Sequence, residues 1–236
     1  VEQFEAVPRR AIDGLLGGGS LATGPDLDAI DTDNPALAAA GASVARISGI
    51  AYACGTMPSG SGFVVAEDRV VTNAHVVAGL DTPVVELPNE PARDGRVVYF
   101  DPVDDLAVIA VDVDASPLPL ADSLLPGDPA AIQGYPYGGP FRTVPAGVLW
   151  NGPTAIGNIY DTATAERSIY ALDAELHPGN SGGPLLTTSG AVAGVVFARD
   201  EARENVGYAL TNAELLPVLA ALSSANQTVA TGACAT

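Results

Sequence analysis

Short apolar runs rich in valine and isoleucine recur along the chain from about residue 43 to residue 210. Each run is bounded by glycine, proline, aspartate or asparagine, which is typical of β-strands separated by turns. The predicted strands are 43–50, 60–65, 70–72, 82–87, 95–100, 106–111, 130–134, 143–150, 168–173, 183–186, 191–197 and 207–210. Many short strands without alternating helices predict an all-β sandwich or barrel.

Breaks in this pattern divide the chain into four parts. Residues 1–42 carry many aspartates and no apolar period, so we expect an extended arm, with a short helix after Asn34 and Pro35. The turn signal at 126–129 separates two groups of about six strands, at 43–126 and 127–212. A capping-box pattern, Thr211 to Glu214, precedes the apolar run 215–222, so residues 213–236 are predicted to form a short C-terminal helix and a tail.

Composition and charge narrow the classes of function. Of 236 residues, 47% are hydrophobic and 16% charged, which indicates a folded globular chain. The formal net charge is -18 and every basic residue is an arginine, so binding to nucleic acid or to an anionic membrane surface is excluded. The chain lacks a run of 18 apolar residues and a signal peptide, and it begins at Val1. We therefore expect a soluble chain that was cut from a longer precursor.

The two cysteines, Cys54 and Cys234, are far apart in the sequence and lack the spacing of metal ligands. This argues against a zinc site. An even count in an acidic, lysine-free chain that we expect to be exported suggests one disulfide. The alternative is two unrelated buried thiols.

The stretch from Glu175 to Leu185 is typical of a nucleophile loop. Ser181 is flanked by glycines, which allow a tight turn with the hydroxyl exposed. Glycines also let backbone N–H groups converge on one point, as an oxyanion requires. The alternative is an ordinary turn between two strands.

A serine nucleophile needs a base and an orienting carboxylate. His75 follows the apolar run 70–72, where the chain turns, and an acidic cluster at 101–105 leads directly into a buried strand. The resulting order is His75, Asp105, Ser181, which is the order of chymotrypsin-like enzymes. Because the histidine lies in the first group of strands and the serine in the second, the site is expected in the cleft between them.

These stretches, taken together, resemble the trypsin-like serine peptidases of the HtrA/Deg type over about residues 43 to 212. The matching motifs are 60–65, 70–77, 104–108, 131–136, 179–185 and 190–198. The resemblance implies a chymotrypsin-like fold of two six-stranded antiparallel β-barrels. The two cysteines, the long acidic arm and the lack of a PDZ domain resemble one branch, the actinobacterial membrane-anchored periplasmic peptidases of acid resistance (MarP-like). In that branch a multi-span membrane segment precedes the peptidase domain.

The resemblance also implies roles for single residues. Ser181 would attack the peptide carbonyl, His75 would transfer the proton, and Asp105 would hold the histidine tautomer. The N–H groups of Gly179 and Ser181 would form the oxyanion hole. Asp105 is preferred to Asp104 because the family places the acid directly before the Leu-Ala pair.

The chain also departs from the family. Asn180 stands where trypsin has an aspartate, so activation by a new N-terminal amine is not expected. His177 stands where HtrA-type enzymes commonly have asparagine; it is either a loop residue without a role or a pH sensor. Glu175 stands where the base of the specificity pocket is expected, which would favour Arg or Lys substrates, unless it points to solvent. An apolar wall of Val195, Val196, Phe197 and Ala198 conflicts with that preference, so the side-chain preference stays open.

The sequence thus predicts a serine endopeptidase that acts on protein or peptide substrates through an acyl-enzyme, as a monomer, without metal or cofactor. The expected location is the periplasm or another extracytoplasmic space, and the full-length protein is expected to be anchored in the cell membrane, with a role in stress or acid resistance. One alternative is a general HtrA-type quality-control protease. Another is a latent peptide-binding scaffold whose site is not assembled.

Overall fold

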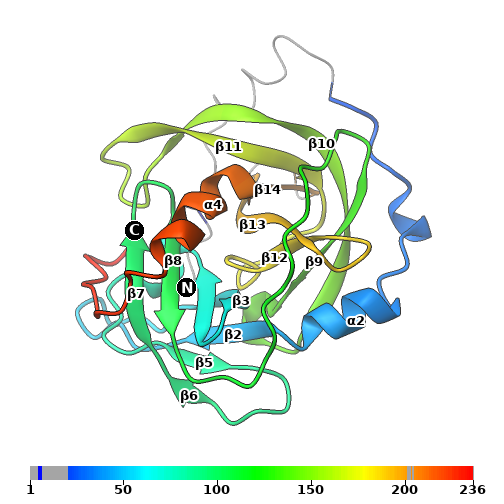
Figure 1. Ribbon diagram of the computed structural model, residues 1–236. Coiled ribbons are helices and arrows are strands. Elements are labelled where there is room, and N and C mark those ends of the chain that lie inside the picture. Colours follow the sequence, from blue (N-terminus) through cyan, green and yellow to red (C-terminus); the bar gives the residue numbers. More distant parts are fainter. Residues whose placement is uncertain (1–4, 7–20, 201–202, 204, 236) are drawn as a thin grey trace.

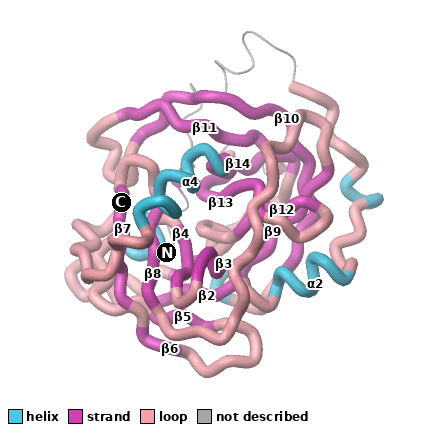
Figure 2. Tube along the Cα trace, in the orientation of Figure 1, coloured by secondary structure: helices cyan, strands magenta, loops and turns pink. Residues whose placement is uncertain are grey.

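The structure, a computed structural model, describes residues 5–6, 21–200, 203 and 205–235. Residues 1–4 and 7–20 of the predicted arm lie outside the described part. Strands dominate the rest, and the few helices are short (Figure 2).

The first sheet has the strand order β6-β5-β2-β3-β4-β8-β7, and all of its pairs are antiparallel. Its strands are β2 (Val44–Ser48), β3 (Ser59–Ala66), β4 (Arg69–Thr72), β5 (Val84–Glu86), β6 (Arg93–Asp94), β7 (Arg96–Asp101) and β8 (Leu106–Ala110). Every residue of β8 is buried, as expected for the valine- and isoleucine-rich runs.

The second sheet has the order β1-β13-β12-β9-β10-β11-β14, and a further pairing of β13 with β14 closes it into a barrel. Its strands are β9 (Pro129–Gly134), β10 (Arg142–Gly157), β11 (Thr164–Asp173), β12 (Pro184–Thr187), β13 (Val192–Arg199), β14 (Val206–Thr211) and β1 (Glu5–Ala6). The short β1 pairs with β13 in parallel. In Figure 1, β10 and β11 lie at the top and β5 and β6 at the bottom, and α4 lies against β13 and β14 of the second sheet.

The predicted all-β, chymotrypsin-like class is confirmed, but each sheet has seven strands where six were predicted. The additional strands, β6 and β1, have two residues each. β6 and β7 are separated only by Gly95, whose N–H donates to Pro83 O at 2.7 Å. One extended segment therefore pairs with β5 at its start and with β8 along its length, and this closes the first barrel.

Two helices lie where the sequence predicted them. α2 (Pro35–Gly41) begins after Asn34, whose side chain accepts hydrogen bonds from the N–H groups of Ala36 and Leu37. α4 (Asn212–Ala221) begins after Thr211, whose hydroxyl accepts from Ala213 N.

The predicted capping box at α4 forms only in half. The Glu214 carboxylate does not return to the start of its own helix; instead it accepts from Ser168 N in β11, at 2.7 Å. The other helices in the described part of the chain are α3 (Ala74–Val77), η1 (Leu27–Ala29) and η2 (Pro136–Gly138). No helix in the described part of the chain is both long and apolar enough to cross a membrane.

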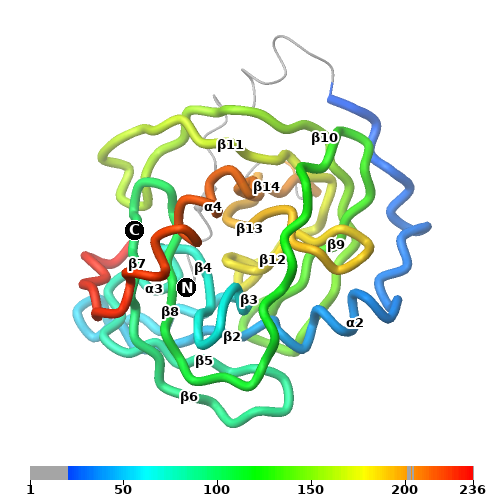
Figure 3. The backbone as a smooth tube through the Cα atoms, in the orientation of Figure 1, coloured from blue at the N-terminus to red at the C-terminus, as the bar shows by residue number. Residues whose placement is uncertain are grey.

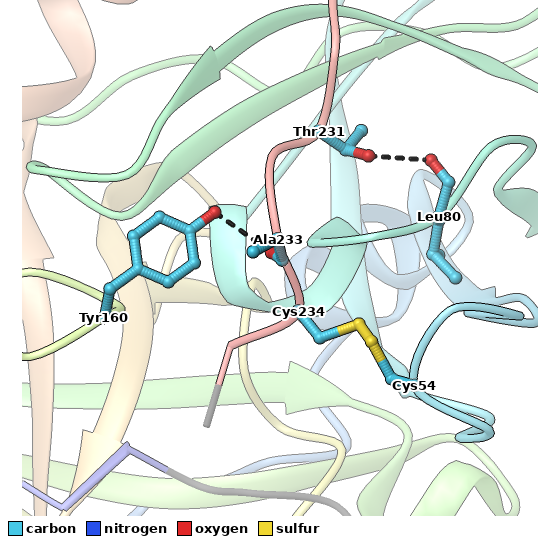
Figure 4. Close-up of a disulfide and its surroundings, with 6 residues drawn as sticks. All are labelled: Cys54, Leu80, Tyr160, Thr231, Ala233 and Cys234. Carbon is cyan, nitrogen blue, oxygen red and sulfur yellow. Dashed lines mark hydrogen bonds between the residues drawn. A yellow bond between two sulfur atoms is a disulfide. The ribbon is translucent and has the colours of Figure 1, made fainter.

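The C-terminal tail returns from α4 to the first barrel and runs beside β7 (Figure 3). Val229 N donates to Val97 O at 2.9 Å, within β7. Farther along, the Thr231 hydroxyl donates to Leu80 O at 2.9 Å, beyond the end of α3 (Figure 4).

A disulfide between Cys54 and Cys234 fixes the end of this tail, as the sequence suggested (Figure 4). The two Cα atoms are 6.5 Å apart, within the usual range for a disulfide. The Tyr160 hydroxyl, at the tip of the β10–β11 hairpin, donates to Ala233 O at 3.0 Å. The tail therefore contacts both barrels.

Candidate active site

Asp105 lies in the tight turn that joins β7 to β8. The Asp101 carboxylate accepts the N–H groups of Val103 and Asp104, at 2.8 and 3.1 Å, and so shapes the turn. Asp105 itself has a positive φ of 54°, which aspartate tolerates better than most residues. In this turn the carboxylate of Asp105 is completely buried.

His75 lies in α3, the short helix that follows β4. Its ring Nδ1 lies 2.8 Å from Asp105 Oδ2, and its backbone N–H donates to Asp105 Oδ1 at 2.9 Å. Asn73 adds a third contact, because its side-chain amide donates to Asp105 O at 2.9 Å. A carboxylate can only accept, so the proton of the neutral imidazole resides on Nδ1 and Nε2 is left as the basic atom.

Of the two adjacent aspartates, the structure brings Asp105 and not Asp104 to His75. Asp104 lies on the other side of the turn and is only partly buried. Burial, together with the negative charges of Asp101 and Glu214, raises the pKa of the Asp104 carboxyl, and the charge of Arg167 opposes this rise.

The loop that carries Ser181 is bound to β3 through Ser61. Ser61 N donates to Ser181 O at 2.8 Å, and the Ser61 hydroxyl donates to Gly179 O at 2.6 Å. Tyr135 N in turn donates to the Ser61 hydroxyl at 2.9 Å. Ser61 was not singled out from the sequence, because a small polar residue in an apolar strand gives no sign of its partners.

Two glycines allow the loop to approach its neighbours. Gly179 has φ +96°, and a Cβ there would lie 2.3 Å from Tyr135 O. Gly182 has φ +81°, and a Cβ there would lie 2.1 Å from Ser61 O and 3.1 Å from Asn73 N, two residues before His75. The loop therefore packs closely against the end of β4 that leads into α3.

The hydroxyl of Ser181 is held in this crowded interface between the barrels. The residue is 3% exposed, and Oγ has no hydrogen-bond partner among the described residues. A buried hydroxyl without a partner is uncommon, and such groups in native proteins call for a functional explanation.

The backbone N–H groups of the loop fall into two sets. Those of Asn180, Gly182 and Gly183 donate to backbone carbonyls at 2.8 to 3.1 Å. Those of Gly179 and Ser181 make no hydrogen bond with the described part of the chain. These are the two groups that the resemblance assigned to an oxyanion hole.

Asn180, the residue before the serine, keeps the loop in shape. Its Oδ1 accepts from His177 N at 3.0 Å, and the side chain is almost fully buried. An internal amide thus fills the position of the aspartate that, in trypsin, pairs with a new N-terminal amine.

His177 and Glu175 lie together at the exposed rim of the loop. His177 Nε2 is 3.3 Å from Glu175 Oε1, and the Glu175 side chain is 68% exposed. The ring of His177 stacks on Tyr137, with centroids 5.1 Å apart, and the Tyr137 hydroxyl lies 3.1 Å from Nδ1. Glu175 therefore points to His177 and to solvent, which is the second of its two interpretations from the sequence.

Tyr137 was missed because it is distant in the sequence from the serine loop. Its backbone has φ 56°, and its N–H donates to Pro178 O at 2.5 Å. The only sequence signal was its place beside the matched motif at 131–136.

The predicted pocket wall is fully buried. Val195, Val196, Phe197 and Ala198 each have no exposed surface. The N–H of Val196 donates to Gly183 O at 2.9 Å, and its carbonyl accepts from Gly182 N at 2.8 Å. The pocket-wall segment is thus bound to the serine loop through the backbone of Val196. The described residues include no group of three or more His, Cys, Asp or Glu that could hold a metal ion.

The chain is similar to known serine proteases. The trypsin-like peptidase domain family matches residues 60–195. The serine protease Rv3671c of Mycobacterium tuberculosis is 38% identical over 209 residues, which cover 86% of this chain and 51% of that protein. A protein of Halomonas elongata named "Probable periplasmic serine endoprotease DegP-like" is 35% identical over 162 residues, covering 64% of this chain and 32% of that protein.

Among solved structures, the active form of the M. tuberculosis Rv3671c protease superimposes with a TM-score of 0.86 and 33% identity. The match covers 100% of this chain and 99% of that one. The chain spans about half the length of the Rv3671c protein itself.

Proposed function

Because the chain belongs to the trypsin-like serine peptidases of the HtrA type, we propose that it is an endopeptidase with Ser181 as nucleophile, His75 as base and Asp105 as orienting acid. The observation that carries this proposal is the double contact between His75 and the fully buried Asp105. The Asp105 carboxylate binds both the ring Nδ1 and the backbone N–H of His75. Nε2 is therefore the ring atom that can accept the serine proton.

The reaction follows from these roles. Ser181 Oγ attacks the peptide carbonyl while His75 Nε2 takes its proton, and the carbonyl oxygen becomes an oxyanion. The imidazolium then gives the proton to the leaving amine, which departs and leaves an acyl-enzyme. A water molecule, deprotonated by the same nitrogen, then attacks the acyl carbonyl; the acyl–oxygen bond breaks, the acid leaves, and the imidazolium returns its proton to Ser181 Oγ. Asp105 stays ionised and stabilises the imidazolium through Nδ1–H.

The N–H groups of Gly179 and Ser181 would stabilise the oxyanion. Both lack partners in the described part of the chain, and both belong to a loop fixed by Ser61, Asn180 and Val196. Donors that are already in position need no reorganisation when charge develops, and one such donor is worth about 10²–10³ in rate.

We also propose an extracytoplasmic, periplasmic location. The name of the Halomonas relative and the Cys54–Cys234 disulfide support it, since disulfides persist in oxidising compartments. Anchoring of the full-length protein in the membrane, a monomeric state and a role in stress or acid resistance remain proposals from the resemblance. A general quality-control role is the alternative within the same enzyme class.

A peptide-binding scaffold is the alternative outside the enzymes. The specific observation in its favour is that Ser181 Oγ makes no hydrogen bond with the described residues. In that case a peptide would bind beside the serine loop without being cleaved.

The test is cleavage of casein by the wild type and by Ser181→Ala at pH 5 and pH 7.5, with and without reductant. We expect wild-type cleavage that the Ser181→Ala variant lacks. An inactive wild type under all four conditions, or an equally active Ser181→Ala variant, would contradict the proposal. Binding of casein without cleavage by both proteins would favour the scaffold.

A further inference from the structure

Arg167, in β11, is a completely buried arginine, which is unusual because charged side chains are seldom removed from water without a full set of partners. Its Nη2 donates to Gly157 O at 2.7 Å. Its Nε and Nη1 are buried and have no hydrogen-bond partner among the described residues. The guanidinium carbon lies 5.3 Å from the centroid of the Phe197 ring, a cation–π arrangement.

Arg167 belongs to the hairpin through which the second barrel contacts the first. The β10–β11 hairpin, which carries Arg167, contacts the β7–β8 turn of the first barrel, because Ile159 N donates to Pro102 O at 3.1 Å. Next to Arg167, Ser168 N donates to Glu214 of α4. The hairpin is therefore fixed between the acidic turn and the start of the C-terminal helix.

Charges around this junction are mostly negative. The turn contributes Asp101, Asp104 and Asp105, and α4 contributes Glu214; Tyr99 of β7 and His75 of α3 are the other titratable neighbours of this turn. The positive charge of Arg167 acts on the turn, since it lowers the pKa of Asp104 against the effects of burial and of two carboxylates. Of the four influences on this pKa, that of Arg167 is the smallest, so the buried cation relieves the repulsion within the turn only in part.

Phe197 connects the same cation to the serine loop. It follows Val196 in β13, and Val196 forms the two backbone hydrogen bonds that hold Gly182 and Gly183. Arg167 therefore packs on Phe197 of the second barrel, and its charge acts on Asp104 in the turn of the first.

We propose that Arg167 is a positioning residue for catalysis, whose buried guanidinium holds the Asp101–Asp105 turn of the first barrel in register with β13 and the serine loop of the second. The proposal rests on the proposed peptidase function. It accounts for a buried cation with incomplete hydrogen bonding, which is seldom retained for stability alone because apolar replacements of such charges are often neutral or stabilising.

The test is the variant Arg167→Met, which keeps an unbranched side chain and removes the charge. We expect kcat to fall about tenfold or more, a change of about 1.4 kcal/mol in the barrier, with KM within about threefold of the wild type. The acidic limb of kcat/KM should move to higher pH, because losing a cation makes the nearby carboxylates and imidazole bind protons more tightly. The melting temperature should not fall, because replacing a buried charge by an apolar side chain of similar size is often neutral or stabilising.

Two further variants separate positioning from a merely structural role. Arg167→Lys keeps the charge, so its acidic limb should stay at the wild-type pH while kcat recovers in part. Arg142→Met removes an exposed arginine of β10 whose side chain makes no hydrogen bond with the described residues, and it should behave as the wild type.

Wild type and Ser181→Ala are measured first in the same assay. An inactive wild type would contradict the proposed function, whereas an active wild type with unchanged Arg167→Met kinetics would overturn this inference alone. A fall in kcat that only follows a fall in melting temperature, with an unmoved acidic limb, would also overturn it. If Arg167→Met does not fold, Phe197→Leu is the second variant: it removes the ring under the guanidinium, and full activity there would overturn the inference.

Discussion

At the scale of single residues, the carboxylate of Asp105 is the most constrained group of the site. It accepts two hydrogen bonds from His75 and has no exposed surface. In Asp105→Asn an amide replaces one acceptor oxygen, so Nδ1 can no longer donate to the same place and the wrong tautomer is favoured. We expect kcat to fall about 10⁴-fold with the fold retained. Single-turnover kinetics with a peptide ester measure this loss, and a loss below tenfold would exclude the role of Asp105.

The ring of His177 contacts Tyr137 and Glu175, and both contacts depend on whether the ring is protonated. Neutral, its Nδ1 can accept from the Tyr137 hydroxyl while Nε2 donates to Glu175. Once protonated, both ring nitrogens donate, so the Tyr137 hydroxyl must turn from donor to acceptor and the attraction to the Glu175 carboxylate strengthens. The pH-sensor hypothesis predicts that His177→Asn changes the shape of the pH–rate profile between about pH 5 and 8. A superimposable profile for wild type and variant would leave His177 as a loop residue without this role.

At the scale of elements, the acidic β7–β8 turn gives a pH-dependent prediction. The raised pKa of Asp104 means that the folded state binds this proton more tightly than the unfolded chain. At low pH both states are protonated, and as pH rises through the ordinary carboxyl range, ionisation disfavours the folded state. Asp104→Asn should therefore increase the free energy of unfolding at pH 7 and not at pH 3.

Urea unfolding at the two pH values measures this difference. Asp122→Asn, which removes an exposed carboxylate elsewhere, controls for net charge. A gain for Asp104→Asn that is the same at pH 3 and pH 7, or the same as for the control, would contradict the argument.

The serine loop gives the second prediction at this scale. In Gly182→Ala the new Cβ would lie 2.1 Å from Ser61 O at a φ of +81°, so the loop must move away from β3. We expect activity to fall at least about 100-fold, since an ångström of displacement is enough for such a loss. Gly127→Ala is a matched control with φ +95° and no neighbour within 4 Å. It should lose about 1–2 kcal/mol of stability from backbone strain and keep its activity; equal activities would contradict the packing argument.

Some strands could be predicted from the sequence alone, and others could not. Runs such as 106–111 gave their strands directly, because valine and isoleucine bounded by turn residues allow little else. The outer part of the β10–β11 hairpin was missed, since Asn151, Gly152 and Pro153 are typical of a break; the partner strand supplies the pairing that these residues do not favour by themselves. The contact between His75 and Asp105 was expected from the order of the motifs, and the structure contains it. The burial of Arg167 was not expected, because it arises only from tertiary packing.

At the scale of the whole molecule, the tail joins α4 of the second barrel to the first barrel and ends in the Cys54–Cys234 disulfide, across a sequence separation of 180. Closing so long a loop restricts the unfolded chain strongly. The double variant Cys54→Ser/Cys234→Ser, which leaves no free thiol, should therefore lose about 2–5 kcal/mol of unfolding free energy. Urea unfolding checks this value, and a difference below about 1 kcal/mol would show that the tail is held by its other contacts.

The proposed mechanism depends on a serine nucleophile that is activated where the two barrels meet. The most direct measurement is labelling with a fluorophosphonate, followed by mass spectrometry of the modified peptide, for the wild type, His75→Ala and Arg142→Met. The account predicts one adduct on Ser181 in the wild type and in Arg142→Met, and none in His75→Ala. An adduct on another residue, or labelling of Ser181 at the same rate without His75, would contradict it.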